Sequence, residues 1–161
     1  MNILPGSPDP DQSPIHSNGR LADPVFENDE LLYRRFDPKR FLLNGILSPL
    51  AFNFPRQSVN RGKFSVPGDV LEPDCCDGTQ LTGWQVVALL VGDMPQRLIS
   101  GDNREFHFFL RHMPVPRCYA HSEMRCNQGG PDVEVYAQPP KKVRDEFRMT
   151  LARKCARCRL T

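Results

Sequence analysis

The chain has 161 residues, a length that fits a single domain, and hydrophobic residues make up 39% of it. Its formal net charge of +2 is too small to predict nucleic-acid binding by itself. The longest apolar run, residues 86–91, is far too short to cross a bilayer, which argues against a membrane protein. The amino-terminus lacks the basic and apolar stretches of a secretion signal, so we expect a cytoplasmic protein with reduced cysteines.

The amino-terminal segment is rich in proline and poor in large apolar side chains. Five of the 16 prolines lie within the first 24 residues. Such a segment buries too little surface to offset the entropy lost on ordering. The composition therefore predicts a disordered tail over residues 1–27 and one folded domain over residues 28–161.

Short β-rich runs, separated by proline and glycine, predict a sheet of short strands. The run at 84–91 is almost continuously apolar, which predicts a strand covered on both faces. Three runs follow it at close spacing, as in an antiparallel sheet. Residues 31–36, the first run in the chain, are compatible with a strand or a helical turn. The expected extended segments are residues 31–36, 48–54, 57–61, 84–91, 106–112, 117–126 and 132–137.

A helix is predicted over residues 141–157, directly after Pro139-Pro140. Its apolar side chains recur at four-residue intervals and form one stripe. They are Val143, Phe147, Leu151 and Cys155. The fold class predicted is therefore α+β: a mainly antiparallel sheet of short strands, with a C-terminal amphipathic helix on one face.

The segment around His121 has the densest polar chemistry. On a regular strand, Tyr119, His121, Glu123 and Arg125 point to one face. His121 and Glu123 would be neighbours, and could act as a base with its orienting carboxylate, or as an acid and a base. The alternative is the polar outer face that alternation predicts for any antiparallel sheet.

Arginines elsewhere could join this face. Arg35 follows Arg34 in one strand, and Ser58 and Arg61 lie three apart in another. If these groups converge on His121, they predict a pocket for an anion or a nucleotide. The alternative for each arginine is an ordinary place on the surface.

The cysteines and the basic C-terminus carry two further alternatives. Cys118-x2-His121 and Cys155-x2-Cys158 supply four ligands for tetrahedral zinc, although Cys118 and His121 face opposite sides of a regular strand. No other cofactor is expected, because the Walker A, GxGxxG, HExxH and GxSxG motifs are absent. Eight basic residues from position 141 onward, in the segment Lys141–Arg159, could contact nucleic-acid phosphates or simply form a solvated helix surface.

Three blocks of sequence resemble small uncharacterised bacterial proteins that carry LYRR…P, SVNR and N-[PY]-A-H-x-E motifs. The blocks are residues 32–35 with Pro38, residues 58–61, and residues 119–123. Cys118 stands where the resemblance leads us to expect asparagine. No activity is attached to such proteins, so the resemblance implies a set of residues rather than a mechanism. These are Arg34, Arg35, Ser58, Arg61, His121 and Glu123.

Three functional hypotheses follow. The sequence favours a small accessory or interaction protein whose partner is another protein, as in a bacterial multi-protein module. The second hypothesis is an enzyme acting on a nucleotide or other phosphate-bearing substrate, with His121 as acid or base, Glu123 orienting it, and Arg35 and Arg61 holding the anion. The third is nucleic-acid binding through Lys141–Arg159.

Overall fold

The computed structural model describes residues 16–76 and 78–160. Residues 1–15 of the predicted tail therefore lie outside the described residues. Residues 16–27, assigned to the same tail by composition, lie against the domain. The Tyr119 hydroxyl donates to the Leu21 carbonyl at 2.7 Å, and Lys63 pairs with Asp23 at 2.8 Å.

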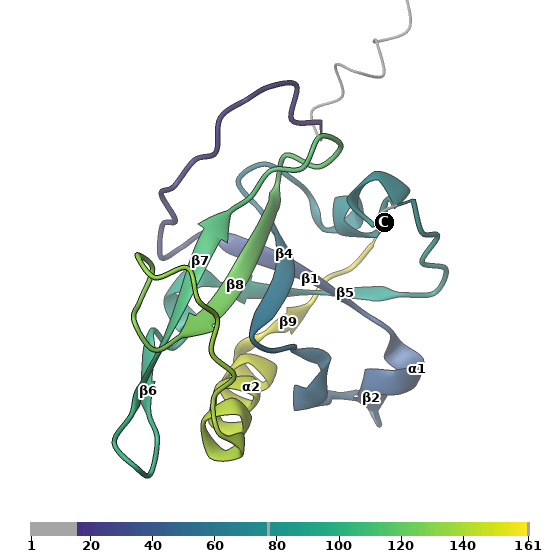
Figure 1. Cartoon of the computed structure of the whole chain (residues 1–161). Helices are drawn as coiled ribbons and strands as arrows, with labels where there is room; N and C mark the ends of the chain where they lie inside the picture. The colour runs from purple at the N-terminus through teal and green to yellow at the C-terminus, as the bar shows by residue number, and fades with distance from the viewer. Residues whose placement is uncertain (1–15, 77, 161) are drawn as a thin grey trace, which may run out of the picture.

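A seven-stranded sheet forms the centre of the fold, in the order β6-β7-β8-β4-β1-β5-β9 (Figure 1). Every pairing between neighbouring strands is antiparallel. The strands are β1 (Leu31–Phe36), β4 (Arg56–Arg61), β5 (Gln85–Leu90), β6 (Arg97–Ile99), β7 (Glu105–His112), β8 (His121–Asn127) and β9 (Ala156–Arg157).

The helix α2 (Lys141–Lys154) covers one face of this sheet and completes the main core. Its stripe of Val143, Phe147 and Leu151 is buried, as the four-residue spacing predicts. The Phe147 ring stacks on Phe108 of β7, with ring centroids 4.1 Å apart. The predicted α+β class, a mostly antiparallel sheet with a C-terminal helix, is confirmed.

Several short elements connect the strands. Asn44 and Gly45, both with positive φ, make the tight turn of a small hairpin. The remaining elements are α1 (Pro38–Phe41), β2 (Leu42–Leu43), β3 (Ile46–Leu47), and the 3₁₀ helices η2 (Pro49–Ala51), η3 (Pro67–Leu71), η4 (Pro73–Cys75) and η5 (Val91–Asp93). No helix in the part of the chain described is long and apolar enough to span a membrane.

The opposite face of the sheet is partly covered by the segment that contains η3 and η4. Val70 of η3 packs there with Tyr33 and Val86, so β5 is covered on both faces as predicted. A disulfide between Cys75 and Cys118 joins this segment to the β7–β8 connection, with Cα atoms 5.2 Å apart. The expectation that all cysteines are reduced is therefore wrong for this pair.

Three predicted strands differ from the structure. Residues 132–137 form no strand, because their expected partner β8 is already paired with β7 and β4 on its two edges. Residues 117–120 form a turn, and β8 begins only at His121. In the run 48–54, Ser48 caps η2 by accepting from the Leu50 amide at 3.2 Å, so that apolar alternation belongs to a 3₁₀ turn.

Candidate functional site

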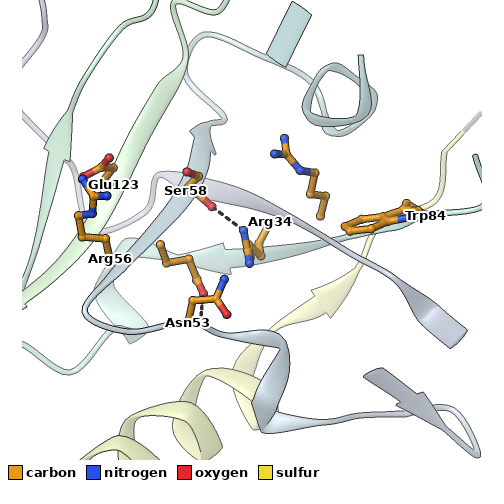
Figure 2. A pocket seen from close by; sticks show the side chains of 8 residues that line it. Arg34, Asn53, Arg56, Ser58, Trp84 and Glu123 are labelled. Carbon is orange, nitrogen blue, oxygen red and sulfur yellow. Dashed lines mark hydrogen bonds between the residues drawn. The ribbon is translucent and has the colours of Figure 1, made fainter. Parts of the chain in front are cut away.

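A hollow opens where β1 and β4 separate. The two strands pair only at Leu32 with Arg61 and at Tyr33 with Asn60, and beyond these pairs the hollow begins. Its volume of about 390 Å³ is typical of small-molecule sites. Figure 2 shows its labelled side chains, which come from β1, β4, β8 and the loops around them. The lining residues are Arg34, Arg35, Asn53, Arg56, Gln57, Ser58, Trp84 and Glu123.

A second hollow of about 470 Å³ adjoins the first. The two share Arg34, Arg35, Asn53 and Trp84, and the second adds Arg40. Together they form the anion pocket, the name used below for both hollows. Asn53 and Trp84 lie at the boundary between them, and Trp84 is the only tryptophan of the chain.

Arg34 is the innermost cation of the anion pocket. It donates to the carbonyls of Ser58 at 3.2 Å and Ala51 at 3.5 Å, and the first contact is drawn in Figure 2. Its Nε is buried and has no hydrogen-bond partner among the described residues. Burial, with a smaller effect of Arg35, lowers the pKa of Arg34 to about 10. The guanidinium is thus still charged at neutral pH, and its buried Nε–H is unpaired in the described part of the chain.

Arg35 holds the covering segment in place. Its Nη1 donates to the Cys75 carbonyl at 2.8 Å and the Val70 carbonyl at 3.2 Å. These acceptors are neutral, so they leave the positive charge of Arg35 uncompensated.

The charge of the anion pocket is strongly unbalanced. It is lined by four arginines and a single carboxylate, Glu123. That carboxylate pairs at 2.9 Å with the buried Arg125. Among the described residues, no carboxylate lies within 4 Å of the guanidinium nitrogens of Arg34, Arg35, Arg40 or Arg56. Such a pocket attracts an anion.

Ser58, which lines the anion pocket, contacts His121, which is not among the lining residues. They lie diagonally across the β4–β8 ladder, and the Ser58 hydroxyl is 3.3 Å from His121 Nε2. His121 Nδ1 lies 2.7 Å from the Met113 carbonyl, and the Met113 amide donates to the His121 carbonyl at 3.0 Å. The orienting group of His121 is therefore the backbone of Met113, whereas the sequence suggested Glu123.

Arg61 lies on the other face of the sheet, away from the anion pocket. Its side chain is fully buried and makes a bidentate pair with Glu30, at 2.6 and 2.8 Å. It also donates to the carbonyls of Asp23 and Val25 and lies over the Phe26 ring. The residue anchors segment 23–30. The structure places Arg35, Ser58 and Glu123 around the anion pocket, sets His121 against Ser58, and leaves Arg61 apart.

The four candidate zinc ligands are not gathered at one place. Cys118 is in the disulfide with Cys75, which removes its thiolate. Cys155 and Cys158 are free and half-buried, and Cys158 packs with Tyr33 near β5. No group of three or more His, Cys, Asp or Glu side chains able to hold a metal occurs within residues 16–76 and 78–160.

Several basic side chains of α2 already have partners within the helix or elsewhere in the protein. Arg148 donates to the Phe52 carbonyl at 2.8 Å, Lys141 pairs with Asp145 at 2.5 Å, and Lys154 pairs with Asp93 at 3.6 Å. These contacts reduce the number of cations on the helix that are free to meet a phosphate backbone.

Comparison with known proteins gives no further guidance, because no family model, curated protein or solved structure matches the chain. The resemblance to LYRR-containing bacterial proteins therefore stays a prediction. Sequence patterns also gave no reason to select Asn53, Arg56, Trp84 or Met113 for the site.

Proposed function

We propose that the anion pocket binds a small phosphate-bearing ligand of the nucleotide class. The observation that carries the proposal is the convergence of Arg34, Arg35, Arg40 and Arg56, none of which has a carboxylate within 4 Å among the described residues. Arg34 and Arg35 are half-buried, and half-burying a cation is costly unless an anion compensates it. A phosphate group supplies that charge and accepts several N–H bonds at once.

Trp84 suggests what accompanies the phosphate. Its half-buried indole lines both hollows, as do Arg34 and Arg35. Aromatic rings bind nucleobases by stacking, which contributes about 1–3 kcal/mol per base. The combined volume leaves room for a phosphate on the arginines and a planar base beside Trp84.

The test uses Trp84 as its own reporter. Because the chain has one tryptophan, a change in fluorescence on adding ADP reports on the anion pocket alone. Arg40→Gln and Arg56→Gln remove exposed pocket cations, and each should weaken ADP binding by about tenfold. Arg153→Gln makes the same change of charge on the exposed side of α2 and should leave ADP affinity unchanged. If all three variants weaken ADP binding equally, the effect is due to net charge alone and a defined site is refuted.

The other hypotheses from the sequence stay predictions. An accessory role with a protein partner is compatible with a bound nucleotide, which could control such a partnership. Nucleic-acid binding through α2 predicts affinity that falls steeply with salt and is insensitive to Arg56→Gln. A cytoplasmic location also stays a prediction, and the Cys75–Cys118 disulfide favours an oxidising compartment instead.

A further inference from the structure

We infer that Ser58 and His121 form a nucleophile–base pair that cleaves a phosphate ester held in the anion pocket. This inference rests on the proposed function, because it needs a phosphate bound by the arginines. It goes further by assigning a reaction to the site and a role to each of the two side chains.

The hydrogen bonds around His121 determine which of its nitrogens carries the proton. The Met113 carbonyl can only accept, so Nδ1, at 2.7 Å from it, carries the hydrogen and donates. In the neutral ring Nε2 then has a free lone pair. It faces the Ser58 hydroxyl at 3.3 Å, and the hydroxyl is the donor in that contact. This is the geometry in which an imidazole activates a hydroxyl.

Met113 fixes the orientation of the ring. Its amide donates to the His121 carbonyl at 3.0 Å while its own carbonyl accepts from the ring, so one residue binds both the main chain and the side chain of His121. A base oriented in this way by a third group is the arrangement expected of an activated nucleophile.

The Ser58 side chain also faces the right place. It lines the hollow that Arg34 and Arg35 line, and Arg34 donates to the Ser58 carbonyl at 3.2 Å. A phosphate held in this hollow by the two arginines would therefore lie beside Ser58. The arginines would stabilise the charge that develops on the phosphoryl oxygens during attack.

The reaction has two steps. In the first, Ser58 Oγ forms a bond to phosphorus as the bond from phosphorus to the leaving oxygen breaks. His121 Nε2 takes the hydroxyl proton and gives it to that oxygen. In the second, His121 takes a proton from water, the water oxygen attacks phosphorus, and the Ser58–phosphorus bond breaks. Ser58 regains a proton from His121, and the products are an alcohol and a phosphate.

The experiment combines hydrolysis of bis(p-nitrophenyl) phosphate with ADP binding followed by Trp84 fluorescence. We expect wild-type protein to release nitrophenolate, and Ser58→Ala to reduce the rate at least about a thousandfold. ADP binding should be retained, because alanine keeps the carbonyl that accepts from Arg34. His121→Gln should lower the rate by about a hundredfold or more. Ser65→Ala, which removes a hydroxyl that donates to the Arg61 carbonyl instead, should have no effect.

The outcomes separate this inference from the proposed function. If wild-type protein binds ADP but does not hydrolyse bis(p-nitrophenyl) phosphate, the Ser58–His121 assignment is overturned and the binding site stands. Failure to bind ADP would remove the proposed function itself. Full activity in Ser58→Ala with none in His121→Gln would make His121 the nucleophile and overturn the role of Ser58. If Ser58→Ala does not fold, mass spectrometry of wild-type protein during turnover decides: a phosphoryl adduct on Ser58 supports the inference, and an adduct elsewhere, or none, refutes it.

Discussion

Replacing Arg61 by alanine should strongly destabilise the domain. The side chain is fully buried, and the side chain of its partner Glu30 is only 5% exposed. The substitution leaves a carboxylate in the interior without its cation, which costs about 3–5 kcal/mol. It also removes the donors to the carbonyls of Asp23 and Val25, which hold segment 23–30 against the sheet. A domain of this size has a total stability of about 5–15 kcal/mol, so a third or more of it is at stake.

Urea unfolding followed by circular dichroism measures this loss. The matched control is the double variant Arg61→Met with Glu30→Leu, which removes both charges together. It should recover much of the stability lost in Arg61→Ala, because no unpaired buried charge is left. A loss below about 1 kcal/mol in Arg61→Ala would refute the assignment of this arginine as a structural anchor, since that is the range of exposed pairs.

Three further predictions concern other parts of the fold. His112 donates from Nε2 to the Tyr119 carbonyl and accepts the Asp23 amide at Nδ1, and burial lowers its pKa below the ordinary value. Protons then bind the unfolded state more readily, so thermal stability should fall as the pH drops below about 6.5. Reduction of Cys75–Cys118, which closes a loop across 43 positions, should cost about 4 kcal/mol in urea unfolding. Phe147→Ala should cost about 3–5 kcal/mol by leaving a cavity.

Each of these has a control. In His112→Gln the loss of stability on acidification should be smaller than in wild-type protein, and an unchanged loss would assign it to other groups. When the protein is unfolded without a reducing agent, titration should find four free thiols, and six would contradict the disulfide. Met149→Ala, on the exposed side of α2, should cost much less than Phe147→Ala, and equal costs would contradict the packing of the helix.

Local sequence patterns predicted the parts of the fold that depend on burial along one element. The apolar stripe of α2 predicted which face of the helix is buried, and the continuous apolar run of β5 predicted a strand covered on both faces. The run at 48–54 has a similar alternation, but Ser48-Pro49 begins a 3₁₀ turn there. Asn44-Gly45 is a strong hairpin signal that our interpretation of the sequence passed over.

The candidate site could be predicted only in part, because it depends on long-range geometry. Neighbours on a strand point to opposite faces, and Arg34 and Arg35 stand opposite Val87 and Val86 in that way. Both line one hollow because β1 and β4 part beyond Tyr33, and no local pattern encodes that separation. The alternation of side chains along β4 also explains why Arg61, three positions after Ser58, points to the opposite face of the sheet.

The most direct test of the anion pocket is a titration of wild-type protein with ADP, followed by competition with pyrophosphate. We predict a saturable change in the fluorescence of Trp84 that pyrophosphate reverses and that weakens as ionic strength rises. A fluorescence signal that stays unchanged at ADP concentrations up to about 10 mM, where even weak sites of a few kcal/mol would fill, would contradict phosphate binding at this site.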